Sequence, residues 1–171
     1  LKNYIKHVPE HLYLVDLICH GVPSKKMLHD HIKHVAKGKN IQYISFRKGN
    51  DFIISLKTSD FTYNANMWEE PYKDLYMKGF LDGMTYRSSC YKCPFACSTR
   101  VSDITIGDFW GLKNAELLPE ETRDGVSLLL PMTDKGLKLL QVVESNFHII
   151  ERSVDEAVDG NTQLRHPSIQ G

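Results

Sequence analysis

The sequence predicts a single α/β domain, with a mixed sheet and flanking helices. Short apolar runs typical of strands alternate with segments that have helical periodicity. A chain of 171 residues is long enough to bury one core. No linker, internal repeat or low-complexity stretch divides it, so we expect one domain over 1–171.

The first half of the chain predicts a strand, a helix and a hairpin. The almost continuous apolar run at 12–19 indicates a buried strand inside the sheet. Ser24 is a good N-cap for a helix to about Lys37, ended by Gly38. The apolar stripe of this helix consists of Leu28, Ile32 and Val35. The sequence then predicts strands at 41–47 and 51–58, joined by a hairpin turn at Lys48-Gly49-Asn50, and a third strand at 61–67.

The second half continues the alternation. Pro71 fits the first turn of a helix to about Leu81. The residues of this helix expected to face inward are Tyr72, Leu75, Tyr76 and Phe80. The later elements are expected to be a strand at 103–107, a polar loop at 112–124, a strand at 126–130, a helix capped by Thr133, a closing strand at 147–150 and a loosely ordered tail from about Asp159.

Composition excludes several classes of protein. The formal net charge is zero and the lysines are scattered, which does not favour a nucleic-acid surface. No apolar run is long enough for a membrane span, and no signal peptide is visible. The chain starts with Leu1 in an apparent amphipathic helix, so we interpret it as a fragment of a longer cytoplasmic protein.

Three of the four cysteines lie within eight residues and predict a metal or cluster site. Cys90, Cys93 and Cys97 have C-x2-C-x3-C spacing, which lets three thiolates converge from one loop. Zinc sites usually show two separated pairs, so the spacing favours iron–sulfur. Cys19 follows the first predicted strand and is a candidate fourth ligand, although a packed thiol is equally consistent.

Other polar residues have weaker patterns. His20 is a candidate ligand or proton donor, or else a backbone-bonded imidazole. His29, His31 and His34 are interpreted as a solvated helix face. After the cysteine loop, Asp103 and Asp108 are candidates for cofactor contacts, for partners of Arg87 or Arg100, or for turn and cap residues. Gly107 and Gly111 would let the backbone approach a ligand closely.

Several motifs together resemble the C-terminal domain of the coenzyme F-420 hydrogenase/dehydrogenase beta-subunit family. They are Cys19-His20-Gly21-Val22-Pro23-Ser24, Arg87-Ser88-Ser89-Cys90-Tyr91-Lys92-Cys93 and Asp103-Ile104-Thr105-Ile106-Gly107-Asp108-Phe109-Trp110-Gly111. Gly125-Val126-Ser127 and Thr133-Asp134-Lys135-Gly136 fit the same pattern. The resemblance covers about residues 10 to 165.

The resemblance implies an iron–sulfur flavoprotein module of an oxidoreductase. A [4Fe-4S] cluster held by Cys90, Cys93 and Cys97 would exchange electrons with FAD and with coenzyme F-420 or another redox partner. Cys19 would be a possible fourth ligand, and a cysteine upstream of this chain an alternative one. Arg87, Asp108, Trp110 and His20 would lie near the cofactors, and the partner would be another subunit or an upstream ferredoxin-type domain.

Two other functions remain open from the residues themselves. The cysteines could bind structural zinc and only tie the loop to the sheet. The domain could also have lost its cofactor and simply dock a partner subunit. Metal content separates these alternatives from an electron-transfer module.

Overall fold

The structure, a computed structural model, describes residues 9–49, 51–113, 120 and 125–169. These residues form two compact units: one from those up to His20 together with Cys93–Pro167, the other from Gly21–Lys92 with Ser168 and Ile169. Each unit holds a three-stranded sheet. The predicted α/β class is confirmed, with the strands divided between two sheets instead of sharing one. The helix expected at the start lies outside the described residues.

The sheet of the first unit has the order β1-β5-β6. β1 (Val15–Leu17) runs parallel to β5 (Ile104–Asp108), and β6 (Ser127–Pro131) pairs with β5 in the antiparallel sense. The prediction that the first strand is internal is wrong, because β5 takes the centre. β1 is a short edge strand, so Val15 and Leu17 are more than half exposed.

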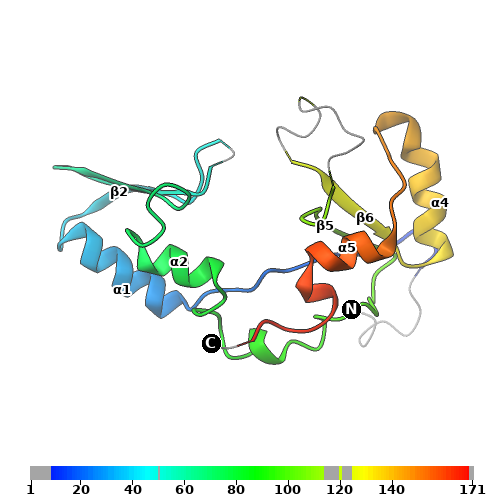
Figure 1. The fold of residues 1–171 in the computed structure, drawn as a ribbon, viewed down its shortest axis with the longest axis horizontal. Coiled ribbons are helices and arrows are strands. Elements are labelled where there is room, and N and C mark those ends of the chain that lie inside the picture. Colours follow the sequence, from blue (N-terminus) through cyan, green and yellow to red (C-terminus); the bar gives the residue numbers. More distant parts are fainter. Residues whose placement is uncertain (1–8, 50, 114–119, 121–124, 170–171) are drawn as a thin grey trace. The chain divides into compact units, whose positions relative to one another are not determined.

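Helices after β6 complete the first unit. α4 (Asp134–Val143) begins where predicted, with the Thr133 hydroxyl accepting a hydrogen bond from Gly136 N at 3.1 Å. In Figure 1 it lies beside β6. η3 (Glu144–Asn146), α5 (Val154–Gly160) and η4 (Thr162–Leu164) follow.

Two expectations for this region differ from the structure. The closing strand at 147–150 is wrong, since these residues have no regular structure and their side chains are exposed. The segment after Asp159 is not loose as predicted, because Asn161 and Leu164 are buried. Asn161 Nδ2 donates to the carbonyls of Asp108 and Ala157, which ties this segment to the sheet. Most of the loop predicted at 112–124 lies outside the described residues.

The second unit contains α1 (Lys25–Ala36) and an antiparallel sheet of order β2-β3-β4. The strands are β2 (Ile41–Ser45), β3 (Ile53–Thr58) and β4 (Thr62–Asn66), which confirms the predicted hairpin and third strand. Ser24 occupies the N-cap position without a side-chain cap bond. The core of the unit consists of Ile54, Ala65, Met67 and Met77.

The second helix starts later than Pro71. α2 (Leu75–Leu81) is capped by Asp74, whose carboxylate accepts from Met77 N at 2.8 Å. Because of this shift, Tyr72 and Leu75 are 75% and 69% exposed rather than inward, whereas Tyr76 is buried as predicted. α1 and α2 lie next to each other on one side of the β2-β3-β4 sheet (Figure 1).

Candidate metal centre

The chain crosses between the two units inside the predicted cysteine motifs. One boundary falls between Lys92 and Cys93, and another directly after His20, next to Cys19. All four cysteines are free thiols. Cys19 is exposed, whereas Cys90, Cys93 and Cys97 are partly buried. Free, partly accessible thiols have the donor chemistry that thiolate-bound metals require.

The part of the cysteine loop within the second unit is held by tyrosines. Cys90 opens the short helix η1 (Cys90–Lys92). The hydroxyl of Tyr91 donates to Gly83 O at 2.7 Å and accepts from Tyr86 N at 3.1 Å. Cys90 Sγ accepts a hydrogen bond from Val22 N at 3.4 Å. Hydrogen bonds of this kind orient the side chains that bind metals, so the contact is compatible with a metal-binding cysteine.

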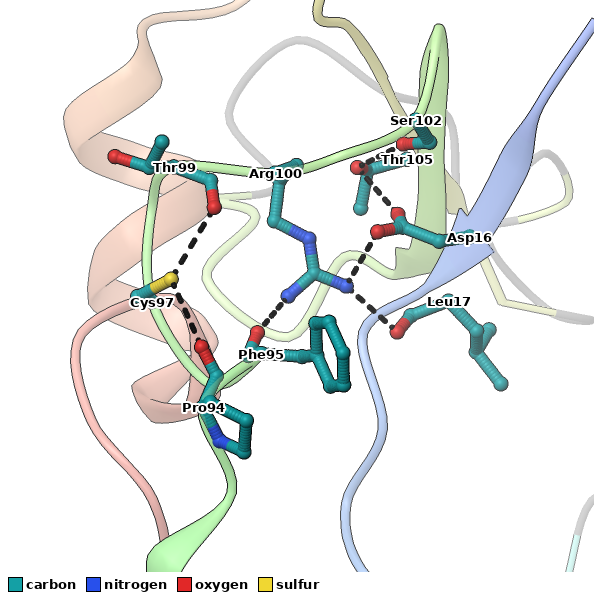
Figure 2. Close-up of polar contacts among 9 residues, drawn as sticks. All are labelled: Asp16, Leu17, Pro94, Phe95, Cys97, Thr99, Arg100, Ser102 and Thr105. Atoms are coloured by element: carbon teal, nitrogen blue, oxygen red, sulfur yellow. Dashed lines mark hydrogen bonds and ion pairs between the residues drawn. The ribbon is translucent and has the colours of Figure 1, made fainter. Parts of the chain in front are cut away.

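The part of the loop within the first unit bends around Cys97. Its thiol donates to Thr99 O at 3.2 Å and, over a longer distance of 3.7 Å, to Pro94 O. Figure 2 shows Arg100 beside this bend, with its guanidinium directed at Phe95 O on the loop and at Asp16 and Leu17 on β1. One side chain therefore joins the cysteine segment to the edge strand.

Arg100 forms a nearly buried charge pair. Nη2 lies 3.1 Å from Asp16 Oδ2 and donates to Leu17 O at 3.0 Å, and the Arg100 side chain is 5% exposed. Thr105 Oγ1 donates to the other oxygen of Asp16 at 2.6 Å. The sequence interpretation that Asp103 or Asp108 could hold Arg100 is wrong, because Asp16 does so. The sequence signal for this pair was Asp16 itself, a charged residue inside an otherwise apolar strand run.

Asp103 instead connects two of the sequence motifs. It accepts from Leu14 N and from the Thr133 hydroxyl, both at 2.9 Å, and Lys135 Nζ lies 3.9 Å away. A Cβ on Gly136 would lie 2.0 Å from Asp103 O, so only glycine permits this approach. The Thr133-Asp134-Lys135-Gly136 motif therefore anchors α4 to the start of β5.

The glycines near the end of β5 pack against the chain itself. A Cβ on Gly107 would lie 2.9 Å from the Ile18 side chain, and one on Gly111 would lie 2.2 Å from Glu156 O in α5. The sequence predicted that both glycines let a ligand approach the backbone closely, but contacts within the protein are enough to explain them. Their role in this structure is tight packing of the protein.

The other predicted cofactor residues are divided between the two units. In the first unit His20, Asp108 and Trp110 are exposed, Trp110 by 62%. In the second unit Arg87 is exposed and its backbone N–H donates to Val22 O at 2.9 Å. Among the described residues, no three His, Cys, Asp or Glu side chains gather into a metal site. The thiols suit a cluster by their chemistry, and their convergence stays a prediction.

The histidines of α1 are not a uniformly solvated face. His31 is 15% exposed, and its Nε2 lies 2.8 Å from Asp74 Oδ2, whose side chain is fully buried. Burial alone would raise the pKa of Asp74, but hydrogen bonds from His31 and Met77 outweigh it, and the pKa falls below its ordinary value. Burial and this carboxylate raise the pKa of Tyr63. Sequence spacing within α1 alone could not reveal a partner on another element.

The α/β fold thus carries three free cysteines within eight residues. Residues 1–157 match the family described as the C terminus of the beta subunit of coenzyme F420 hydrogenase/dehydrogenase. The chain belongs to this family, as its motifs predicted, and so to a family of oxidoreductase subunits. A search of curated proteins finds no match. No helix in the described ranges has the length and apolar character to cross a membrane.

Proposed function

We propose that this chain is the iron–sulfur module of an oxidoreductase, in which Cys90, Cys93 and Cys97 hold a [4Fe-4S] cluster. The observation that carries the proposal is the C-x2-C-x3-C run of free thiols in a member of a hydrogenase/dehydrogenase beta-subunit family. Cys19, or a cysteine outside this chain, supplies the fourth ligand. The cluster would supply one-electron transfer.

The protein would contribute geometry and electrostatics to this function. The Val22 N–H donates to Cys90 Sγ and would orient that sulfur as a ligand. The Arg100 guanidinium holds the segment that carries Cys97 against β1. Each half of the loop is thus supported by contacts within its own unit.

Membership of this family extends the proposal to redox partners. Electrons would pass between the cluster, a flavin such as FAD, and a deazaflavin-type or other redox partner. The partner would be a further subunit or an upstream ferredoxin-type domain, in the reducing cytoplasm. Arg87, Asp108, Trp110 and His20 remain the candidates for contacts with these cofactors.

Anaerobic metal analysis tests the proposal directly. The chain is purified without oxygen, reconstituted with ferrous iron and sulfide, and assayed for iron, zinc and acid-labile sulfide beside a visible spectrum. About four iron and four sulfide per chain, with broad absorption near ~400 nm, are expected. Zinc without sulfide would favour the structural-zinc alternative. Absence of any metal after reconstitution would contradict Cys19 as the fourth ligand, and the same assay on a longer chain with the upstream cysteine would then test Cys90, Cys93 and Cys97.

A further inference from the structure

The second unit contains a pocket that the proposed cluster does not use. Its volume is about 720 Å³, within the range of small-molecule sites. α1, β4 and the segment before α2 form its walls. The residues important here are His31, His34, Lys37, Phe61, Tyr63 and Leu75. The wall is thus partly apolar and aromatic, and partly cationic or imidazole.

The polar residues of this pocket differ in whether they already have partners. Lys73 pairs with Glu70 at 2.6 Å, and Asp30 pairs with Lys26. No hydrogen bond or ion pair engages the side chains of His34 and Lys37 within the described part of the chain. The local charge available to a ligand is therefore positive, from Lys37.

His31 is held in one orientation at the pocket wall. Its Nε2 is 2.8 Å from the buried carboxylate of Asp74, and its ring stacks on Tyr76 with centroids 5.3 Å apart. The Tyr63 hydroxyl, 3.2 Å from the same carboxylate, fixes that oxygen further. The ring is therefore fixed by one contact at Nε2 and by stacking on one face. A pre-oriented imidazole of this kind loses little entropy on binding.

Lys37 occupies its position at a conformational cost. It caps α1 with φ of 50°, and it is the one non-glycine residue with positive φ among those described. Glycine is the residue favoured at such a helix end. A lysine in this strained position, at the pocket, is explained if its charge has a use there.

We propose that this pocket is a second ligand site, which binds a small organic anion. The carboxylate or phosphate group of the ligand lies against Lys37 and His34, beside the fixed ring of His31. Its apolar or aromatic body lies against Phe61 and Leu75. The proposal is independent of the cluster, since every residue it uses lies within Gly21–Lys92.

The test is a titration of the whole chain followed by NMR of the histidine and aromatic side chains. Phenyl phosphate and benzoate are the anionic probes, and benzyl alcohol is the neutral probe of similar shape. We expect saturable shifts of His31, His34 and Phe61 with the anions and much weaker ones with the alcohol. No saturable shifts with either anion, or equal binding of the alcohol, would overturn the proposal.

Lys37→Gly makes the test specific, because it removes the charge and relieves the backbone strain together. We expect anion affinity to fall about tenfold, the effect of losing one charged hydrogen bond, without loss of thermal stability. His34→Gln should weaken binding as well. Lys33→Gln is the matched control, since Lys33 is exposed on α1 outside the pocket wall. If Lys33→Gln weakens binding as much as Lys37→Gly, the effect is general charge and the proposed site is wrong.

Discussion

Arg100 Nη2 lies 3.1 Å from Asp16 Oδ2, and this pair joins the segment after Cys97 to the edge strand β1. The two residues are far apart in sequence and both side chains are largely withdrawn from water. The same guanidinium also donates to Phe95 O and Leu17 O (Figure 2). A cation that bonds the loop on one side and a strand on the other restrains both.

Arg100→Gln should destabilise the first unit. Within the described ranges, Asp16 would keep only the Thr105 hydroxyl as a partner for a mostly buried charge, so we expect a loss of about 1–3 kcal/mol in the free energy of unfolding. Urea unfolding measures it, and a cycle with Asp16→Asn isolates the pair. Arg165→Gln, which breaks the exposed pair with Asp159, should change stability by less than about 0.5 kcal/mol. Equal losses in the two variants would show that the Arg100 pair has no special role.

Gly160→Ala should be poorly tolerated because two backbones cross at this residue. A Cβ on Gly160 would lie 1.8 Å from Gly111 N and 2.3 Å from Gly111 Cα. We expect a loss of about 2–3 kcal/mol, since neither backbone can move without disturbing β5 or α5. Gly49→Ala is the comparison: φ there is 60° but no atom lies within 4 Å, so its cost is about 1 kcal/mol from backbone conformation. Thermal denaturation of both variants decides whether packing or backbone freedom dominates.

Cys93→Ser should remove or degrade the proposed cluster and leave both sheets folded, because Cys93 lies outside every strand. Iron and sulfide content falls and far-ultraviolet circular dichroism stays as in the unaltered protein. Cys19→Ser distinguishes the fourth ligand: loss of iron assigns it to Cys19, and normal iron assigns it elsewhere. Normal iron in Cys93→Ser would contradict the ligand assignment itself.

Asp74 should make stability depend on pH in the acid range. Its folded pKa lies below the ordinary value of 3.8, so its contribution is fully present above about pH 3.8. That contribution is lost as the pH falls through the lower folded pKa. Asp74→Asn should therefore be less stable than the unaltered protein at neutral pH, with the gap narrowing in acid.

Urea unfolding between pH 7 and pH 2 measures this gap. Glu69→Gln removes one exposed carboxylate and is the matched control. A gap for Asp74→Asn that stays constant from neutral to acid pH would show that the buried carboxylate is not the source of the dependence.

Local sequence signals predicted the elements whose structure depends on neighbouring residues. The hairpin at β2 and β3 and the Thr133 cap of α4 follow from turn and capping chemistry within a few positions. Boundaries were wrong where tertiary contacts decided them. α2 begins at Leu75 because its cap, Asp74, is buried and paired with His31 of α1, and β1 is an exposed edge because β5 takes the centre of the sheet.

The candidate site shows the same division. The cysteine spacing and the surrounding motifs were sufficient to predict the family, because both are patterns of contiguous residues. Partner choice was not predictable in this way: Arg100 pairs with Asp16 and not with Asp103 or Asp108, and His31 pairs with Asp74. Each pair joins elements that only the folded chain brings together.

The sequence by itself thus determined the α/β class, the family, the cysteine-rich loop and most of the secondary structure. Tertiary structure alone decided the division into two units, the edge position of β1, the close packing of Gly111 against Gly160, and the partners of buried charges. The physical reason is the distance along the chain over which each interaction acts. Capping, turns and ligand spacing act over a few residues, whereas burial and ion pairing depend on which distant segments meet.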